Sequence, residues 1–511
     1  MIRPLCGLAC LLASLNGCAS LPDRPQIAPE SALAPGTDAP LDRALAGAEA
    51  GHAGQAGFRL VVEGMEAFVI RVHSANQAAR SLDVQTYIWH ADATGRYLAQ
   101  VLLAAADRGV RVRLLVDDLD VRARSAGFGA LAAHPNIDVR LFNPFATRRG
   151  SLRLAGEGLR DFGRINRRMH NKSWIADNRI ALVGGRNLGD EYFTASDEVN
   201  FVDLDFAMIG PVVRDVSASF DRFWNSASAW PIEVLDASEV SDDALKNLRA
   251  KLEADSAGTQ QGRYAQALRA DDGIRRLVAG DWALRWSSSY RFVSDDPAKI
   301  TMQKKDASRA AVAADVVGQL RAAQNTLEII SPYFVPGDAG SEVLVSRAKA
   351  GASVQVLTNS LAANDVASVH GGYSRHRKAL LEGGVQLFEL KPLGQGSQAT
   401  SFTGSSGASL HTKALTADGT SSFVGSYNLD PRSTWLNCEQ GVWVEEPALA
   451  AQLAVIFRKQ SGGERAWKVT LDDGALRWND GQETAASEPG ASGWRKFQAW
   501  FARAFHLDAQ L

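Results

Sequence analysis

The chain carries one short motif twice, at positions 241 residues apart, and this repeat constrains the fold more than any other feature. Each copy reads His-x-Lys-x4-Asp, with an Asn ten residues after the Asp. The members are His170, Lys172, Asp177 and Asn187 in the first copy, and His411, Lys413, Asp418 and Asn428 in the second. Agreement at this many fixed offsets indicates an internal duplication, which decides the architecture before any local pattern is considered.

The duplication extends beyond the motifs. Residues 107–116 have an echo in 349–357, residues 139–142 match 385–388, and residues 82–84 match 327–329. At 511 residues and 46% hydrophobic content, the chain is long enough to bury two full-sized cores. We therefore expect two related domains, at residues 46–232 and 271–460. A charged helical connector at 233–270 and a C-terminal extension at 461–511 complete this division.

Each half alternates strand-like and helix-like segments, which is typical of α/β layers. Residues 84–89 and 110–116 read as strands and residues 95–108 as a helix. Residues 175–183 predict a strand pair that turns at Asp177. We expect each His-x-Lys segment to lie on a strand, where residues two apart point to the same face.

The residue types suit the exchange of phosphodiesters. This chemistry needs a nucleophile, an acid for the leaving oxygen, and positive charge on the non-bridging oxygens. Two motifs facing each other across a pseudo-two-fold axis supply all three, because one imidazole can attack phosphorus while the other protonates the departing alkoxide. We expect Lys172, Lys413, Asn187, Asn428 and Ser426 to hold the phosphoryl oxygens. No metal or other cofactor is expected.

Each histidine also needs a carboxylate on Nδ1, which fixes the tautomer and stabilises the imidazolium. Aligning residues 209–211 with 445–447 places Asp203 and Glu439 in corresponding positions. We expect these two residues to be the partners of His170 and His411. Asp205 is the competing candidate in the first half.

The paired motifs, with residues 83–89, 187–193 and 425–433, resemble the phospholipase D superfamily, and within it the bacterial cardiolipin synthases of a lipoprotein-like subgroup. The likeness runs from about Gly57 to Lys459. It implies an α/β fold of two duplicated domains, each a mixed β-sheet flanked by helices, with the active site at their interface. It implies a ping-pong reaction through a phosphohistidine. By analogy His170 is the nucleophile and His411 the acid, although the symmetry leaves the roles exchangeable.

The resemblance leaves a smaller role for the aspartates of the two motifs. Asp177 and Asp418 are expected to shape turns through bonds to backbone amides, rather than to carry protons.

The N-terminus predicts export and lipidation. Arg3 precedes an apolar run at residues 5–15, which is too short to span a bilayer and suits a signal peptide at 1–17. Leu15-Asn16-Gly17-Cys18 resembles a lipobox, in which Cys18 receives lipid, and a Pro-rich tether follows at 18–45. An ordinary signal peptide is the alternative. The expected location is the cell envelope, as a membrane-anchored lipoprotein facing the periplasm. Inner or outer membrane stays open, although Ala19 favours the outer membrane by analogy.

Three weaker signals each have two interpretations. Seven arginines between Arg148 and Arg168 could attract anionic head groups or simply form a solvated loop. Aromatic residues at 494, 497, 500, 501 and 505 predict an interfacial helix or a terminal helix docked on the core. His370, Tyr373 and Arg377 could line an acceptor pocket or pack internally.

The leading functional hypothesis is synthesis of cardiolipin from phosphatidylglycerol and a second phospholipid. Hydrolysis to phosphatidic acid, cleavage of nucleic acid, and lipid binding without catalysis are the alternatives. The net charge of −2 gives no support to a nucleic-acid partner. The acceptor, the oligomeric state and any helper subunit stay open.

Overall fold

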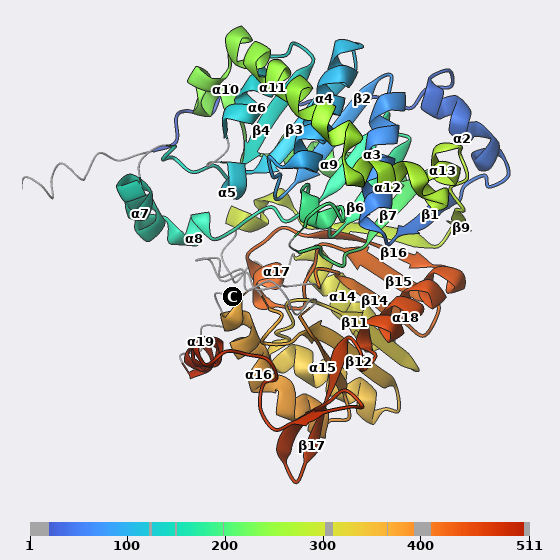
Figure 1. The fold of residues 1–511 in the computed structure, drawn as a ribbon, viewed down its shortest axis with the longest axis vertical. Coiled ribbons are helices and arrows are strands. Elements are labelled where there is room, and N and C mark those ends of the chain that lie inside the picture. Colours follow the sequence, from blue (N-terminus) through green and yellow to red (C-terminus); the bar gives the residue numbers. More distant parts are fainter. Residues whose placement is uncertain are drawn as a thin grey trace, which may run out of the picture.

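Two large mixed β-sheets, each flanked by helices, form the molecule (Figure 1). The computed structural model describes residues 20–121, 125–148, 151–197, 199–301, 310–364, 366–392 and 410–504. The predicted signal peptide and the predicted lipidation site Cys18 lie outside the described residues. Within the described residues, every helix is too short or too polar to cross a lipid bilayer.

The first lobe is built on a nine-stranded sheet in the order β8-β4-β3-β2-β5-β6-β7-β1-β9. Strands β2, β3 and β4 run parallel, and β5, β6 and β7 are antiparallel. The strands are β1 Ala56–Val61, β2 Ser81–Thr86, β3 Arg111–Asp117, β4 Ile137–Phe142, β5 Ser173–Ala176, β6 Ile180–Gly184, β7 Asp205–Ile209, β8 Ala229–Pro231 and β9 Arg285–Ser287. The helices are α2 Pro40–Ala50, α3 Gly64–Gln77, α4 Ala93–Asp107, α5 Asp118–Val121, α6 Ser125–Ala132, α7 Ser151–Arg160, α8 Phe162–Ile165, η1 Asp190–Tyr192 and α9 Val212–Trp224.

The second lobe repeats this arrangement in a ten-stranded sheet, β10-β16-β15-β14-β11-β12-β13-β17-β18-β19. Its run from β13 to β16 corresponds strand by strand to the run from β4 to β7, with the same parallel and antiparallel pairs. The strands are β10 Tyr290–Ser294, β11 Thr326–Ile330, β12 Ser353–Asn359, β13 Gln386–Leu390, β14 Ala414–Ala417, β15 Ser421–Gly425, β16 Gln440–Glu445, β17 Ala466–Asp472, β18 Ala475–Asn479 and β19 Thr484–Ala485. The helices are η3 Pro297–Thr301, α14 Ala311–Ala322, α15 Gly337–Lys349, α16 Ala367–Glu382, α17 Pro431–Trp435, α18 Pro447–Ser461 and α19 Gly493–Ala504.

The central strands are buried on both faces, because helices cover both sides of each sheet. In β5 and β6 every residue is buried. Sequences such as Ile180-Ala181-Leu182-Val183 are therefore continuously apolar instead of alternating, as strands covered on both faces usually are. The structure confirms the strand pair predicted at residues 175–183.

One hydrophobic core joins the two lobes. It includes Phe206 and Met169 from the first lobe together with Val424, Val442 and Cys438 from the second. In Figure 1 the blue-green first lobe lies directly above the yellow-red second lobe, with β6 and β7 facing β15 and β16. The shared core makes the seam between the lobes a fixed part of the fold, so that groups from both lobes can form a single site there.

The structured units extend across the predicted domain boundaries. Strand β9 lies within the predicted second domain but pairs with β1 of the first sheet. The predicted connector forms α10 Ile232–Leu235, η2 Ala237–Glu239, α11 Asp242–Gln261 and α12 Arg263–Ala270, and α13 Asp272–Val278 follows it. In the C-terminal extension, β17 to β19 continue the second sheet.

The described part of the predicted tether lies along the first lobe. Arg24 donates from its guanidinium to the backbone oxygens of Ser226 and Ala229, at 2.9 and 3.0 Å. The Glu30 carboxylate accepts from Arg140 at 2.8 Å. From Pro40 onward the chain is helical, because α2 begins there. Residues 20–39 therefore form no helix or strand, and they are held to the first lobe.

Candidate active site

Each His-x-Lys segment pairs with the backbone of the opposite lobe. The His170 amide donates to the Cys438 carbonyl at 2.8 Å, and the His411 amide donates to the Val202 carbonyl at 2.9 Å. Each histidine lies three residues before the first residue of a strand, Ser173 of β5 or Ala414 of β14. The prediction that these segments lie on strands is wrong by a few residues, because the amides of the two histidines bond to the other lobe and not to an adjacent strand of their own sheet.

The carboxylate partners are exchanged between the lobes. His170 Nδ1 lies 2.9 Å from Glu439 Oε2, and His411 Nδ1 lies 2.6 Å from Asp203 Oδ2. All four side chains are at most slightly exposed. Asp205, the competing candidate, instead accepts from the Arg71 guanidinium at 3.0 Å. Each imidazole therefore belongs to one lobe, and its carboxylate partner belongs to the other.

The two carboxylates have different surroundings. The Ser426 hydroxyl donates to Glu439 Oε2 at 2.5 Å. At the corresponding place in the first lobe stands Gly185, and a Cβ there would come within 2.2 Å of Asp203 Oδ1. The first lobe therefore has no room for a serine beside Asp203. The hydroxyl of Ser426, predicted as a substrate contact, is engaged in orienting Glu439.

Both motif lysines lie at the seam and contact their own histidine's backbone. Lys172 Nζ donates to the His170 carbonyl at 2.6 Å, and Lys413 Nζ donates to the His411 carbonyl. Burial lowers the pKa of Lys172 to about 7, although the charge of Glu439 opposes this shift. Burial also raises the pKa of Glu439 to about 7. The charge state of this pair therefore changes near neutral pH, as a coupled unit.

Replacing Lys172 with Arg tests whether the lysine's charge is needed. The lowered pKa means that the ammonium is present below pH about 7 and is lost as the pH rises through that value. We expect kcat/KM of the wild type to fall on this alkaline side. Lys172→Arg should have a lower absolute rate, because the guanidinium is planar, but its alkaline limb should move to higher pH. An unchanged alkaline limb in this variant would show that another group controls it.

Burial favours the neutral form of both imidazoles at neutral pH. Burial holds the pKa of His170 well below its usual value and lowers that of His411 to about 4. The charges of Lys172 and Lys413 lower both histidine pKa values further. The pKa of each histidine therefore responds to the lysine of the other motif as well as to its own.

Aromatic side chains pack against both imidazoles, and the sequence did not single them out. The Tyr87 ring meets His170 edge-on, with ring centroids 5.1 Å apart. Tyr192 and Phe201 lie against His411 at 5.3 and 5.5 Å. Tyr87 and Tyr192 fall within stretches 83–89 and 187–193 that carry the family resemblance, which is the signal that could have identified them.

The two motif asparagines are placed differently. Asn187 Nδ2 donates to the Tyr192 hydroxyl at 2.9 Å, and its Oδ1 accepts from the Ile88 amide at 3.2 Å. The Asn187 side-chain amide is therefore already bonded to Tyr192, which lies against His411, and to the backbone next to Tyr87. Asn428 Oδ1 is buried without a hydrogen-bond partner. The side chain of Asn428 is thus the better placed of the two to meet a ligand.

Asp177 and Asp418 bind backbone amides, away from the imidazoles. Asp177 Oδ1 accepts from the amides of Arg80 and Ser81 at 2.7 and 2.9 Å, and its Oδ2 accepts from Ala79 at 2.9 Å. Asp418 accepts in the same way from residues 324–326. Both residues have positive φ, at 52°. These contacts are those of turn-shaping residues.

Asp177→Ala is expected to destabilise the fold. The substitution removes the acceptor for three amides and places Ala at a positive φ that Asp tolerates better. Each buried amide without a partner costs about 1–3 kcal/mol, so we expect a loss of about 3 kcal/mol or more in the free energy of unfolding. Urea denaturation measures it. Asp418→Ala is the matched control and should cost less, because its turn is more exposed; equal losses would contradict this account.

The described arginines between 148 and 168 are engaged with protein groups. Arg148 pairs with Asp118 at 2.5 Å and Arg168 with Asp117 at 3.2 Å. Their contacts support a structural interpretation instead of recruitment of head groups. One cation that the sequence did not single out, Arg432, donates to the Asn166 side chain and backbone at 2.6 and 2.8 Å. It links α17 to the segment leading into His170.

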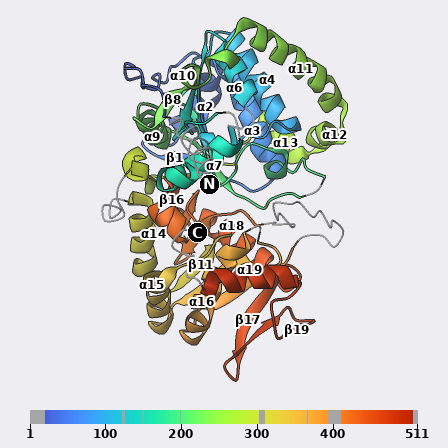
Figure 2. The ribbon, with the colours of Figure 1, turned by 90° about the vertical axis from the view of Figure 1, so that its left-hand side faces the viewer.

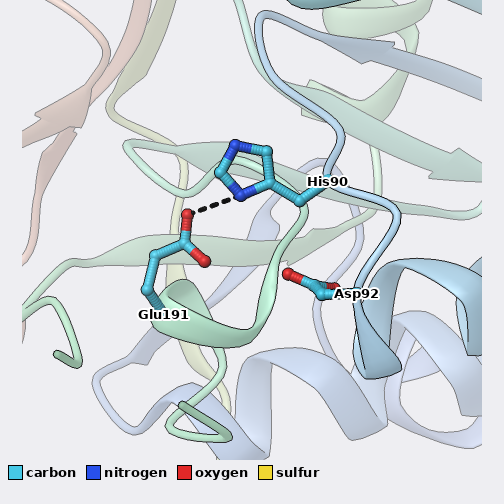
Figure 3. Close-up of side chains that lie close together, drawn as sticks. All are labelled: His90, Asp92 and Glu191. Atoms are coloured by element: carbon cyan, nitrogen blue, oxygen red, sulfur yellow. Dashed lines mark ion pairs between the residues drawn. The ribbon is translucent and has the colours of Figure 1, made fainter. Parts of the chain in front are cut away.

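Another group of a histidine and carboxylates includes Glu191 of η1. Figure 3 shows His90, Asp92 and Glu191, with His90 Nδ1 2.9 Å from Glu191 Oε1. These three could hold a metal ion by proximity. However, the Asp92 carboxylate accepts from the amides of Gly95 and Asp190 at 2.9 and 2.7 Å, capping α4. These hydrogen bonds explain the position of Asp92: it joins the start of α4 to η1.

A family model and several bacterial proteins are similar in sequence to this chain. Residues 72–224 and 316–460 match the family model described as cardiolipin synthase, PLD-like domain. The chain is 43% identical over 455 residues to cardiolipin synthase C of Escherichia coli (strain K12), covering 87% of this chain and 94% of that protein. It is 30% identical over 424 residues to an uncharacterized protein of Helicobacter pylori (strain ATCC 700392 / 26695), covering 83% and 82%.

A solved structure shares the fold. The crystal structure of phosphatidylserine synthase from Haemophilus influenzae Rd KW20 matches with a TM-score of 0.56 at 13% identity, covering 92% of this chain and 100% of that one. The predicted α/β fold of two duplicated domains and the predicted superfamily are both confirmed. The chain belongs to the family of cardiolipin synthases with paired phospholipase D-like domains.

Proposed function

We propose that this enzyme forms cardiolipin by moving a phosphatidyl group from phosphatidylglycerol to the alcohol of a second phospholipid. One observation carries the proposal: two buried imidazoles, each backed by a carboxylate of the opposite lobe, share a cluster with two lysines. The similarity to cardiolipin synthase C supports the choice of lipid substrates.

In the first step, His170 Nε2 attacks phosphorus and a P–N bond forms. The bond from phosphorus to the glycerol oxygen breaks, and His411 gives a proton to that oxygen. In the second step, the acceptor alcohol gives its proton to His411, attacks phosphorus and displaces His170. Lys172, Lys413 and Asn428 would hold the non-bridging oxygens.

The differing carboxylates support this division of roles. Burial alone would raise the pKa of Asp203, but its contacts with His411 and Lys413 outweigh burial and hold the pKa below its usual range. A charged Asp203 favours the imidazolium form of His411, as an acid requires. Glu439, with its pKa raised to about 7, gives His170 less of this support. Burial and Lys413 nevertheless lower the pKa of His411 to about 4, so the proton that His411 donates depends on the substrate: the negative charge of a bound phosphodiester would raise this pKa.

Lipid profiling of cells that express the protein tests the proposal. A new cardiolipin species should appear with the wild type and be lost in His411→Ala. The matched control is His134→Ala, which removes another buried histidine with a carboxylate partner, Asp107 at 3.1 Å. Phosphatidic acid in place of cardiolipin would indicate hydrolysis instead. DNA cleavage without a change in lipids would indicate a nuclease.

We also infer that lipid on Cys18 attaches the enzyme to a membrane of the cell envelope, on the periplasmic side. The sequence of the lipobox supports this. Arg24, six residues later, is fixed to the first lobe, so an anchor at Cys18 would hold that lobe within about 20 Å of the bilayer, given about 3.3–3.6 Å per extended residue. Cys18→Ser should abolish lipid labelling and release the protein from membranes. Retention of label in this variant would refute the assignment.

A further inference from the structure

The C-terminal helix α19 presents a row of aromatic side chains to solvent. Trp494, Phe497, Trp500 and Phe501 are 66, 49, 52 and 42% exposed. The Phe497 ring lies within 5.5 to 6.2 Å of the other three ring centroids. A soluble surface rarely places four large aromatic rings together, and such a patch marks a site of interaction.

The opposite face of α19 is docked firmly. Ala499 and Ala502 are buried against α16. At Gly371 of α16, a Cβ would come within 2.5 Å of the Ala499 carbonyl, so the two helices approach at a point where only glycine fits. The helix is therefore a fixed part of the second lobe, and its aromatic face is held outward by this packing. The docking predicted for the terminal helix is confirmed, and the exposed aromatic rings leave the predicted interfacial role as a prediction.

An ion-pair network holds the segment that leads into α19. Glu488 accepts from Arg377 at 2.6 Å and lies 3.2 Å from His370 Nε2. Arg377 also donates to Glu389 at 2.7 Å. The sequence left His370, Tyr373 and Arg377 open between a pocket and packing. Their described contacts are with the C-terminal segment and the core, which favours packing.

The helix lies at the edge of the second sheet that carries the active site. Arg495 Nε donates to the Leu361 carbonyl at 3.0 Å, in the turn that follows β12. Asn359, the last residue of β12, donates to the Leu410 carbonyl at 3.2 Å, one residue before His411. These two hydrogen bonds, on either side of the end of β12, connect α19 with the segment that carries His411.

The same side of the molecule carries the start of the described chain. Figure 1 places α19, α8 and α10 along its left side, and Figure 2 views that side face on, with α19 in front. Arg24 is bound at β8, immediately before α10. The start of the described chain and α19 therefore lie on the same side of the molecule.

We propose that the aromatic face of α19 seats the enzyme on an anionic phospholipid bilayer and presents the active-site edge to the lipids. The inference rests on the proposed function, because it names the surface from which that site draws substrate. Tryptophan and phenylalanine rings suit the boundary between head groups and acyl chains. Arg503 and Lys496 on the same helix are complementary in charge to phosphatidylglycerol.

A fluorescent label on α19 tests the contact directly. Phe497→Cys in the full chain is labelled with an environment-sensitive dye and added to phosphatidylglycerol vesicles. Val455→Cys on α18, another exposed apolar position at 56%, is the matched control. Cys438 is buried, and the unsubstituted chain gives the background. We expect a blue shift and quenching by brominated lipid at 497 and neither at 455.

Three results would overturn the proposal. The first is equal quenching at both positions, and the second is no quenching at 497. The third is a blue shift at 497 that grows with protein concentration without lipid, which would mean that a second copy covers the face. His411→Ala with the label at 497 should still be quenched. The contact with lipid is thereby tested independently of the chemistry.

An activity measurement links the contact to catalysis. Replacing all four aromatic residues with Ser should lower transfer on vesicles by at least about tenfold, since the interfacial face is lost. The same variant should keep its activity on lipids dispersed in detergent, where no bilayer need be reached. Equal losses in both assays would overturn the proposed role. A wild type inactive in both assays would instead refute the proposed function.

Discussion

His411→Ala is expected to slow phosphatidyl transfer between natural lipids by about 10²–10⁴, the usual contribution of a general acid. The reason is that the glycerol oxygen is a poor leaving group without a proton. With a phosphatidyl ester of p-nitrophenol the leaving group needs no acid, so the first step should stay fast. The second step still lacks a base for the acceptor alcohol. The variant should therefore release one nitrophenolate per chain in a burst and then stall, with the phosphatidyl group bound to His170.

His170→Ala provides the contrast, because it removes the nucleophile. Neither the natural lipid nor the activated ester should react, and no burst should appear. His134→Ala, in which a buried histidine away from the site is lost, should behave as the wild type. A burst in His170→Ala together with none in His411→Ala would mean that the two roles are exchanged.

Exchanging the carboxylates for amides is expected to give the second large effect. Glu439→Gln and Asp203→Asn should each lower the rate by about 10²–10⁴, because an amide neither stabilises the imidazolium nor fixes the correct tautomer. Because each carboxylate contacts the histidine of the opposite lobe, each amide variant should behave like the alanine variant of that histidine. Asp203→Asn should keep the nitrophenolate burst, as His411→Ala does, and Glu439→Gln should lose it, as His170→Ala does.

Asp205→Asn is the matched control for these variants. Asp205 lies two residues from Asp203 and is equally buried, but it pairs with Arg71 and not with an imidazole. Its loss should change the stability and leave the dependence on the leaving group as in the wild type. If Asp203→Asn instead behaved like His170→Ala, the crossed pairing would be wrong.

The sequence named Asp203 and Glu439, which the structure places against the two imidazoles, but it did not show how the two lobes share the site. Aligning the halves identified Asp203 and Glu439 as equivalent residues. Equivalence within a repeat does not say which lobe a side chain serves, because that depends on how the lobes dock. For the same reason the His-x-Lys segments were placed on strands, although the amides of His170 and His411 bond to the other lobe.

Other features were hidden because they arise from contacts distant in sequence. Tyr87 reaches His170 from a loop 83 residues earlier in the chain. Ser426 looks like a phosphate ligand in its motif, yet its hydroxyl binds Glu439. The aromatic spacing of α19 predicted an amphipathic helix, whereas the buried Ala499 and Ala502 show which face is docked.

The most direct test of the central claim is the stoichiometry of tungstate binding, measured by calorimetry on the full chain. Tungstate is a tetrahedral dianion that can stand in for the transferred phosphate. If both imidazoles meet at a single phosphorus atom, one tungstate should bind per chain, and His170→Ala and His411→Ala should each abolish that binding. Two ions per chain, with one lost in each variant, would mean that the histidines serve separate sites and would contradict the account.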